Sequence, residues 1–172
     1  RWPSTLQLDN STVTGNVSAL DGGGVWLNAP YSSIRSSIVS GNSSDIGDRD
    51  NRYGIERAAV VDGSNNIVGS SAPLLTLPAD TRNVDPKLKP LGDNGGATRT
   101  HALSPDSLAI DAGSNPLGFG TDQRGSTFPR SYGTGPDIGA YETQARDFEP
   151  PAPPTQVPTL SRAMLGALFA AL

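Results

Sequence analysis

The residues best suited to chemistry in this sequence are acidic. Asp93, Asp111, Asp122, Asp137 and Glu142 all lie in the C-terminal half of the chain. Carboxylates of this kind bind calcium beside an Arg or Lys base, or work as an acid/base pair that cleaves polysaccharide. Asp122 and Arg124 are close enough in sequence to share such a site. The sequence therefore leaves an acid-based or cation-binding site open in this half.

A simpler interpretation is that the same acids have structural roles and stabilise turns. An Asp beside a turn commonly accepts backbone N–H bonds and fixes the turn. Asp122, Arg124 and Asp137 can also pair and pin a loop-rich segment. The chain lacks the Asp-x-Asp-x-Asp-Gly calcium loop. We therefore expect these acids to have structural roles, and we assign no residue as catalytic or metal-ligating. We expect no cofactor, and Ca²⁺ is the one ion whose binding we keep as an alternative.

Other catalytic groups are scarce, because the chain has one histidine and no cysteine. A lone His101 without a Cys or His partner is more often a packing residue than a ligand. No Ser/His/Asp triad is supported either, since the Gly-x-Ser-x-Gly motif is absent. The lack of cysteine excludes a disulfide scaffold and Cys-based zinc or iron–sulfur sites. A non-enzymatic protein is therefore favoured over an enzyme.

The overall composition sets further limits. A formal net charge of -4 argues against nucleic-acid binding, which usually needs a basic face. With 20 Gly and 15 Pro in 172 residues, turns are dense and long helices are disfavoured. The length suits one domain of ordinary size.

The N-terminal third of the chain repeats itself. Residues 10–16 (NSTVTGN) align with residues 36–42 (SSIVSGN), and residues 65–69 (NNIVG) form a weaker third copy about 28 residues further on. Alternating runs at residues 6–9, 25–27 and 32–35 resemble short strands. The copies carry Val, Ile, Ser, Thr and Asn instead of the many Leu of a leucine-rich repeat. This pattern predicts a parallel β-helix with Leu, Val and Ile inside and Asn and Gly at the corners.

Three local features complete the reading of the repeat. Residues 21–24 (DGGG) predict a tight corner, since no Lys follows them as a phosphate loop requires. Residues 45–57 are charged and nonperiodic, which predicts a loop that leaves the stack. Trp26 alternates with Val25 and Leu27, so it should point outward, where its ring could contact a glycan. Asp9 and Arg35 are the other charges on this surface, and we expect them to be isolated.

The region from residue 84 changes character and becomes rich in turn signals. Four motifs follow in order: DPKLKPLGDNGGATRTHAL (85–103), SPDSLAIDAG (104–113), TDQRG (121–125) and DIGAYE (137–142). Together they closely resemble the bacterial choice-of-anchor Q domain, which ends surface proteins built from pectin-lyase-like β-helix repeats. The resemblance implies structural roles for the motif residues. These are Asp85, Pro86, Asp93, Asn94, Gly95, Gly96, His101, Asp111, Gly113, Asp122, Arg124, Asp137 and Glu142.

The C-terminal end combines a proline-rich tether with an apolar tail. Five prolines lie within residues 150–158, and residues 163–172 are wholly apolar apart from one Gly. Ten such residues are too few to span a bilayer, which needs roughly 20. Val157, Pro158, Thr159, Leu160 and Ser161 resemble the start of the bacterial IPTL-type sorting signal. Arg162 and the missing basic cluster depart from that pattern, so the resemblance implies a truncated signal.

The sequence thus predicts an all-β chain made of the last coils of a right-handed parallel β-helix. The expected division is coils at 1–83, a loop-rich cap at 84–143, a Pro-rich linker at 144–156 and a sorting segment at 157–172. The expected role is that of a non-enzymatic, exported, envelope-anchored structural or adhesive protein fragment. Its expected partners are the envelope sorting machinery and a polysaccharide or surface glycan, with membrane contact only through the tail. The alternative is a polysaccharide lyase or hydrolase, or a glycan-binding module, whose active face lies mainly in coils that precede this sequence.

Overall fold

The structure, a computed structural model, describes residues 5–19, 22–27, 31–48 and 60–148. Its regular elements in these ranges are short strands and one 3-10 helix, η2 (Ala145–Phe148). The prediction of an all-β chain is therefore confirmed. The sorting segment at 157–172, with Val157, Pro158, Thr159, Leu160 and Ser161, lies outside the described residues, as does most of the linker.

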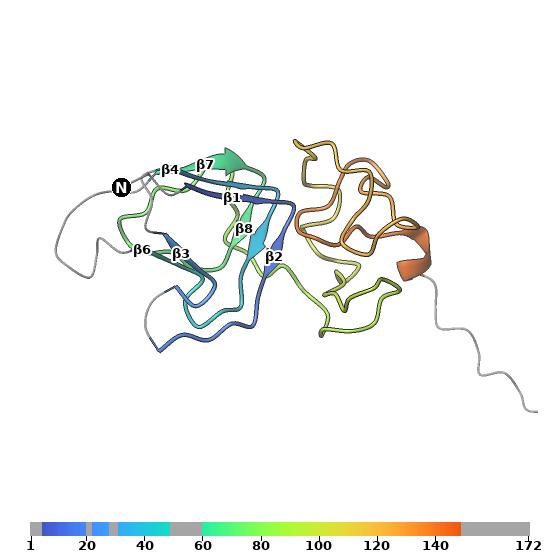
Figure 1. The fold of residues 1–172 in the computed structure, drawn as a ribbon, viewed down its shortest axis with the longest axis horizontal. Helices are drawn as coiled ribbons and strands as arrows, with labels where there is room; N and C mark the ends of the chain where they lie inside the picture. The colour runs from blue at the N-terminus through green and yellow to red at the C-terminus, as the bar shows by residue number, and fades with distance from the viewer. Residues whose placement is uncertain (1–4, 20–21, 28–30, 49–59, 149–172) are drawn as a thin grey trace, which may run out of the picture.

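In the described part of the N-terminal half, eight strands form three parallel sheets (Figure 1). The first sheet orders β1 (Thr5–Asp9), β4 (Tyr31–Arg35) and β7 (Val61–Ser64). The second orders β2 (Thr12–Val13), β5 (Ile38–Val39) and β8 (Ile67–Val68), and the third pairs β3 (Val25–Leu27) with β6 (Ile46–Asp48). The chain therefore visits the three sheets in turn, and we call this part, up to residue 82, the parallel stack.

The register of the stack matches the sequence repeat. Thr12 pairs with Ile38, and Ile38 pairs with Ile67. Successive rounds are thus offset by 26 residues and then by 29, close to the spacing read from the sequence. Each round turns from the first to the second sheet at one residue with positive φ, namely Asn10, Ser36 or Asn65, with φ of 43°, 46° and 55°. Asn suits such a corner because its side chain tolerates the left-handed conformation.

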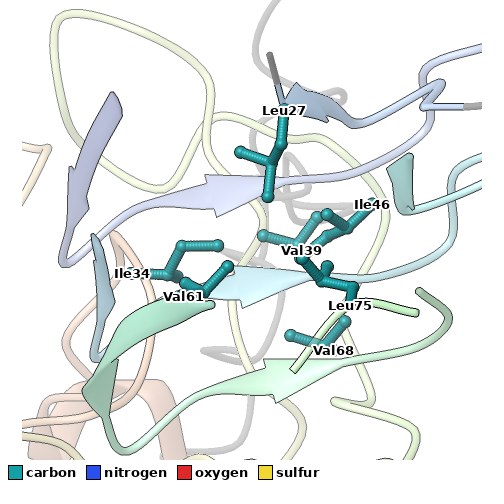
Figure 2. Close-up of a cluster of buried hydrophobic side chains, with 7 residues drawn as sticks. All are labelled: Leu27, Ile34, Val39, Ile46, Val61, Val68 and Leu75. Carbon is teal, nitrogen blue, oxygen red and sulfur yellow. The ribbon is translucent and has the colours of Figure 1, made fainter. Parts of the chain in front are cut away.

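The interior of the stack is an apolar core formed by all three sheets (Figure 2). Strand alternation turns one residue in two inward, and the inward side chains are branched and aliphatic. They are Leu27, Ile34, Val39, Ile46, Val61, Val68 and Leu75, each at most 9% exposed. The expectation of Leu, Val and Ile at the inward positions is confirmed.

A second apolar cluster lies on the outer side of the β2-β5-β8 sheet. Ile38 and Ile67 precede the inward-facing Val39 and Val68, and they pack instead against Leu103, Ala109 and Ile138. Both Ile38 and Val39 are completely buried, although they point to opposite faces of one strand. This sheet is therefore covered on both faces, by the stack interior and by the C-terminal region.

The C-terminal region (residues 84–148) is held together by turns and isolated antiparallel bridges. It lies beside the second sheet in Figure 1 and contacts every round of the stack. Asn10 and Asn65 donate side-chain hydrogen bonds to the carbonyls of Ser114 and Ala112, while the Ser36 hydroxyl accepts a 2.6 Å bond from the Ser114 N–H. The C-terminal region thus covers one side of the stack. Its apolar residues Leu91 and Leu108 are nevertheless more than half exposed.

Two local expectations are wrong. Residues 46–48, expected in a loop, form strand β6, because Ile46 is fully buried in the core while its backbone pairs with β3. Asp9 and Arg35, expected to be isolated, are register partners in adjacent strands, and their side chains form an ion pair of 3.6 Å. Residues 49–57 of the expected loop lie outside the described residues.

The division into domains remains a prediction, although the pairing pattern changes near the expected boundary. The last parallel bridge of the described residues joins Ile67 to Arg82, and the first antiparallel bridge joins Leu88 to Leu103. Strand pairing of the stack type thus ends close to residue 83.

Gly63 supplies a test of the close contact between β4 and β7. A Cβ at this position would lie 1.8 Å from the Ile34 carbonyl oxygen, and its φ is +136°. We expect Gly63→Ala to lower the free energy of unfolding by about 3 kcal/mol or more, because both backbones would have to move.

Gly120→Ala is the control, since nothing lies within 4 Å of its Cβ position. It should change stability by less than about 0.5 kcal/mol in denaturant titrations of the two variants. Equal losses in both variants would contradict the register described here.

Candidate functional site

Three of the sequence-predicted acids belong to a group of buried charged residues inside the C-terminal region. Asp122, Arg124, Arg130, Asp137 and Glu142 are each at most 7% exposed, and we call them the buried charge cluster. Burial of charge is costly unless each group is paired and hydrogen-bonded. The cluster must therefore be explained contact by contact.

Arg124 is held by charge and by aromatic rings. Its Nε donates to Asp122 Oδ2 at 2.9 Å, and a second guanidinium nitrogen donates to the Glu142 carbonyl oxygen. The guanidinium carbon lies 3.9 Å from the centroid of Phe128 and 3.8 Å from that of Tyr141. Cation–π contacts of this kind are strongest when desolvated, as here. Arg124 thus ties three separate segments of the region together.

The carboxylates of the cluster are occupied by backbone N–H groups. Asp122 accepts from the N–H groups of Arg124 and Glu142, at 2.7 and 2.9 Å. Asp137 accepts from Asp111 and Thr143, at 2.8 and 2.6 Å. Glu142 likewise accepts from Tyr132 and Asp137, at 2.7 and 2.9 Å. In a β-sheet, backbone N–H groups donate to the carbonyls of the next strand. In this loop-rich segment the buried carboxylates accept those hydrogen bonds instead.

Arg130 is the least well satisfied member of the cluster. One guanidinium nitrogen donates to the Asp137 carbonyl oxygen at 2.6 Å, and another lies 3.9 Å from Glu142 Oε2. Its Nε and Nη1 are buried and have no hydrogen-bond partner among the described residues. Burial lowers the pKa of Arg130, while nearby carboxylates oppose that shift.

Burial also shifts the pKa values of two acids in the cluster. It raises the pKa of Glu142 to about 7, with the nearby Asp137 charge acting in the same direction and backbone hydrogen bonds opposing it. Burial raises the pKa of Asp137 as well. A raised pKa in a cleft is a mark of an acid catalyst. Glu142 and Asp137 are 0% and 1% exposed, however, so neither carboxyl reaches a ligand in this structure.

The exposed acids of the motifs hold turns. Asp85 accepts the N–H of Lys87 at 2.8 Å, and Asp93 accepts that of Gly95 at 3.0 Å. Asp111, itself at a φ of 55°, accepts the N–H groups of Thr134 and Gly135. The structure therefore places these acids on separate turns and does not gather them into one site.

The remaining motif residues support the same framework. Asn94 donates to the Thr100 carbonyl oxygen at 2.9 Å, His101 Nδ1 lies 2.8 Å from the Lys89 carbonyl oxygen, and the Pro86 carbonyl accepts the Ser107 hydroxyl.

Three glycines of the motifs allow close packing around the cluster. A Cβ on Gly95 would lie 2.9 Å from the Phe128 ring, one on Gly96 2.7 Å from Arg124 Cα, and one on Gly113 2.5 Å from the Asp137 carbonyl oxygen.

Trp26 lies on β3 and is 36% exposed, while its neighbour Leu27 is 1% exposed. Its outward orientation agrees with the strand alternation, and a role in glycan contact remains a prediction. In the described ranges, no three His, Cys, Asp or Glu side chains are arranged to hold a metal ion. The described residues therefore offer no candidate ligand set for Ca²⁺, and calcium binding stays a prediction from the sequence.

A groove runs between the first round of the stack and the C-terminal region. It consists of two adjoining hollows of about 400 and 340 Å³, which share Thr12, Gln123 and Ala140. The first hollow is lined by residues 9–12 of the stack and by Phe119, Arg130 and their neighbours. The second extends past Asn16 to His101 and Tyr141. The groove is a polar recess that is lined by two of the predicted site residues, Asp122 and His101.

Sequence reasoning missed several residues of this site. Arg130, Thr143 and Gln144 are buried polar residues that belong to no predicted set. Gln144 donates to the carbonyls of Pro129 and Glu142. An Arg next to a Pro in a turn-rich stretch carries no local signal of burial, so only the fold reveals it.

Comparisons with protein-family models, curated proteins and solved structures find no match to this chain. In the part of the chain that the structure describes, no helix is both long and apolar enough for a membrane crossing.

Arg124 supplies the first test of the buried charge cluster. Arg124→Met keeps an apolar body between the two rings but leaves the Asp122 carboxylate buried without its cation. We expect the free energy of unfolding to fall by about 3 to 5 kcal/mol. The same substitution at the exposed Arg99 should cost less than about 0.5 kcal/mol in the same chemical denaturation series. Similar losses at both positions would show that the cluster does not hold the region together.

The raised pKa of Glu142 gives a second test. A carboxyl whose pKa is raised by folding stabilises the fold while protonated, and that stability is lost as pH rises through the folded pKa. For Glu142 the window runs from about 4.5 to about 7, and Asp137 shifts in the same direction. The free energy of unfolding should therefore fall between about pH 4.5 and about pH 7, by on the order of 2 kcal/mol.

Glu142→Gln removes the titrating group and should flatten this pH dependence, whatever its effect on absolute stability. Denaturant titrations at several pH values measure both slopes. A wild-type stability that is constant or rises over the window would contradict the assignment.

Proposed function

We propose that the parallel stack is part of a right-handed parallel β-helix. The support is that the chain visits three parallel sheets in turn, at offsets of 26 and 29 residues, with a positive-φ corner in each round. Right-handed crossovers predominate when parallel strands of one sheet are joined through a connection. Each round buries its apolar side chains on its neighbours, as in a solenoid.

We further propose that the protein is an exported, envelope-anchored surface protein whose role is structural or adhesive. The observation that carries the structural role is that the buried acids accept hydrogen bonds from backbone N–H groups. The choice-of-anchor Q-like motifs and the IPTL-like Val157–Ser161 run support a surface location. On this proposal, the tail engages the sorting machinery of the envelope.

A polysaccharide-active or glycan-binding β-helix is the second candidate. The observation in its favour is that the charged side chains of Asp9, Arg35 and Asp62 lie on adjacent strands and are joined by ion pairs of 3.6 and 3.4 Å, with Asp9 the most buried of the three. A strip of acids and bases across neighbouring strands is what such an enzyme needs. Release of unsaturated or reducing ends from a polysaccharide panel, lost in Asp9→Asn and Asp62→Asn, would favour this candidate.

The surface role is tested by deleting the chain after Pro154 in the protein expressed in its own cells. We expect the body to remain folded and envelope retention to be lost, because the deletion removes the Val157–Ser161 motif and the apolar residues that follow it. Cell fractionation and protease accessibility measure retention. A matched control replaces residues 163–172 with a scrambled order of the same residues while keeping Val157–Ser161. Undiminished retention of the deleted protein would overturn the proposal.

A further inference from the structure

We propose that the second hollow of the groove binds a carboxylate, carried by a small organic acid or by the C-terminus of a peptide. This inference goes beyond the proposed surface role and does not depend on it. Its basis is the sign of the charges at the hollow. Arg99 and His101 line the hollow, whereas its lining residues in the described part of the chain include no Asp or Glu. The whole chain has a net charge of -4, so a recess with basic side chains and no acid departs from the average surface.

The local backbone places Arg99 and His101 on the same side of one segment. Thr100 lies between them, is 2% exposed, and exchanges two backbone hydrogen bonds of 3.0 Å with Gly92. In extended backbone successive side chains point to opposite faces, so both neighbours of the inward Thr100 point outward. Asn94 also donates to the Thr100 carbonyl and hydroxyl oxygens, at 2.9 and 3.0 Å. Both basic side chains therefore line the hollow from a firmly held backbone.

Both side chains can donate hydrogen bonds to an anion. Arg99 is exposed, and within the described part of the chain its guanidinium forms no hydrogen bond or ion pair. The His101 ring is held by Nδ1, which must carry a proton because the Lys89 carbonyl oxygen 2.8 Å away only accepts. The other ring nitrogen, Nε2, donates to an anion once the ring is protonated. The planar guanidinium adds a pair of donors whose geometry matches a carboxylate.

The rest of the lining favours an organic carboxylate over an inorganic anion. Val13 and Leu91 line the hollow, and Leu91 is 53% exposed although it is aliphatic. A ligand with a short apolar body would cover this side chain and remove it from water, which is favourable. Phosphate has no apolar part, and the single guanidinium balances a monoanion better than a dianion. The volume of the hollow, about 340 Å³, also lies within the range of small-molecule sites.

The test uses the full chain with two carboxylate probes. These are 3-methylbutanoate for a free organic acid and acetyl-glycyl-leucine for a peptide C-terminus. The amide of each probe keeps its size and removes its charge, and inorganic phosphate is the anion without an apolar part. Calorimetry measures Kd, and amide shifts in two-dimensional NMR spectra locate the site.

We expect at least one carboxylate to bind saturably, with amide shifts at Thr100 and Gln123, which both line the hollow. Its amide should bind about tenfold more weakly or not at all, because the charge-assisted hydrogen bonds are lost. Whichever of the two carboxylates binds more tightly identifies the source of the ligand.

Arg99→Gln removes the permanent charge of the hollow and should raise the Kd of the carboxylate about tenfold. Arg82→Gln is the matched control, because Arg82 is also exposed but lines neither hollow. Its Kd should equal that of the wild type, and thermal unfolding checks that both variants are folded.

Three results would each overturn the proposal. The first is that neither carboxylate binds saturably up to about 20 mM. The second is that the amides or phosphate bind as tightly as the carboxylates. The third is that Arg99→Gln binds the carboxylate no more weakly than Arg82→Gln.

Discussion

The burial of the β2-β5-β8 sheet on both faces is the constraint on which the rest of the structure depends. Two-residue strands such as Ile38–Val39 place one side chain in the stack interior and the next against the C-terminal region. If the C-terminal region were absent, Ile38 and Ile67 would face water. If the stack were absent, Leu103, Ala109 and Ile138 would have little left to pack against. The two parts therefore stabilise each other, and the groove exists because they meet along one side.

The C-terminal region has few strands, so most of its backbone N–H groups find no partner in a sheet. Several of them donate hydrogen bonds to buried carboxylates, and Arg124 and Arg130 supply the opposite charge. Such an arrangement specifies one loop conformation, because each carboxylate joins segments far apart in sequence. Because these acids are buried, the same arrangement raises the pKa of Asp137 and Glu142.

The sequence predicted those parts of the fold that depend on local repetition. The NSTVTGN and SSIVSGN copies gave the strand register, and alternation gave the inward residues and the orientation of Trp26. It failed at Ile46, where charged neighbours hid a buried strand, and at Asp9 and Arg35, which only the register brings together. The double burial of Ile38 and Val39 could not be foreseen, because alternation does not say what covers the outer face. For the same reason neither Arg130 nor the groove had any local signal, since both are products of packing between distant segments.

The central claim is that the C-terminal region packs on the outer face of the β2-β5-β8 sheet. Methyl-resolved NMR on the full chain tests it most directly, because Ile38 and Val39 are adjacent in sequence yet belong to different clusters. The expected result is nuclear Overhauser contacts from the Ile38 and Ile67 methyls to those of Leu103, Ala109 or Ile138. Val39 and Val68 should show contacts to Leu27 and Ile46 instead. Contacts from Ile38 to the interior set alone, or none to the C-terminal region, would contradict the account.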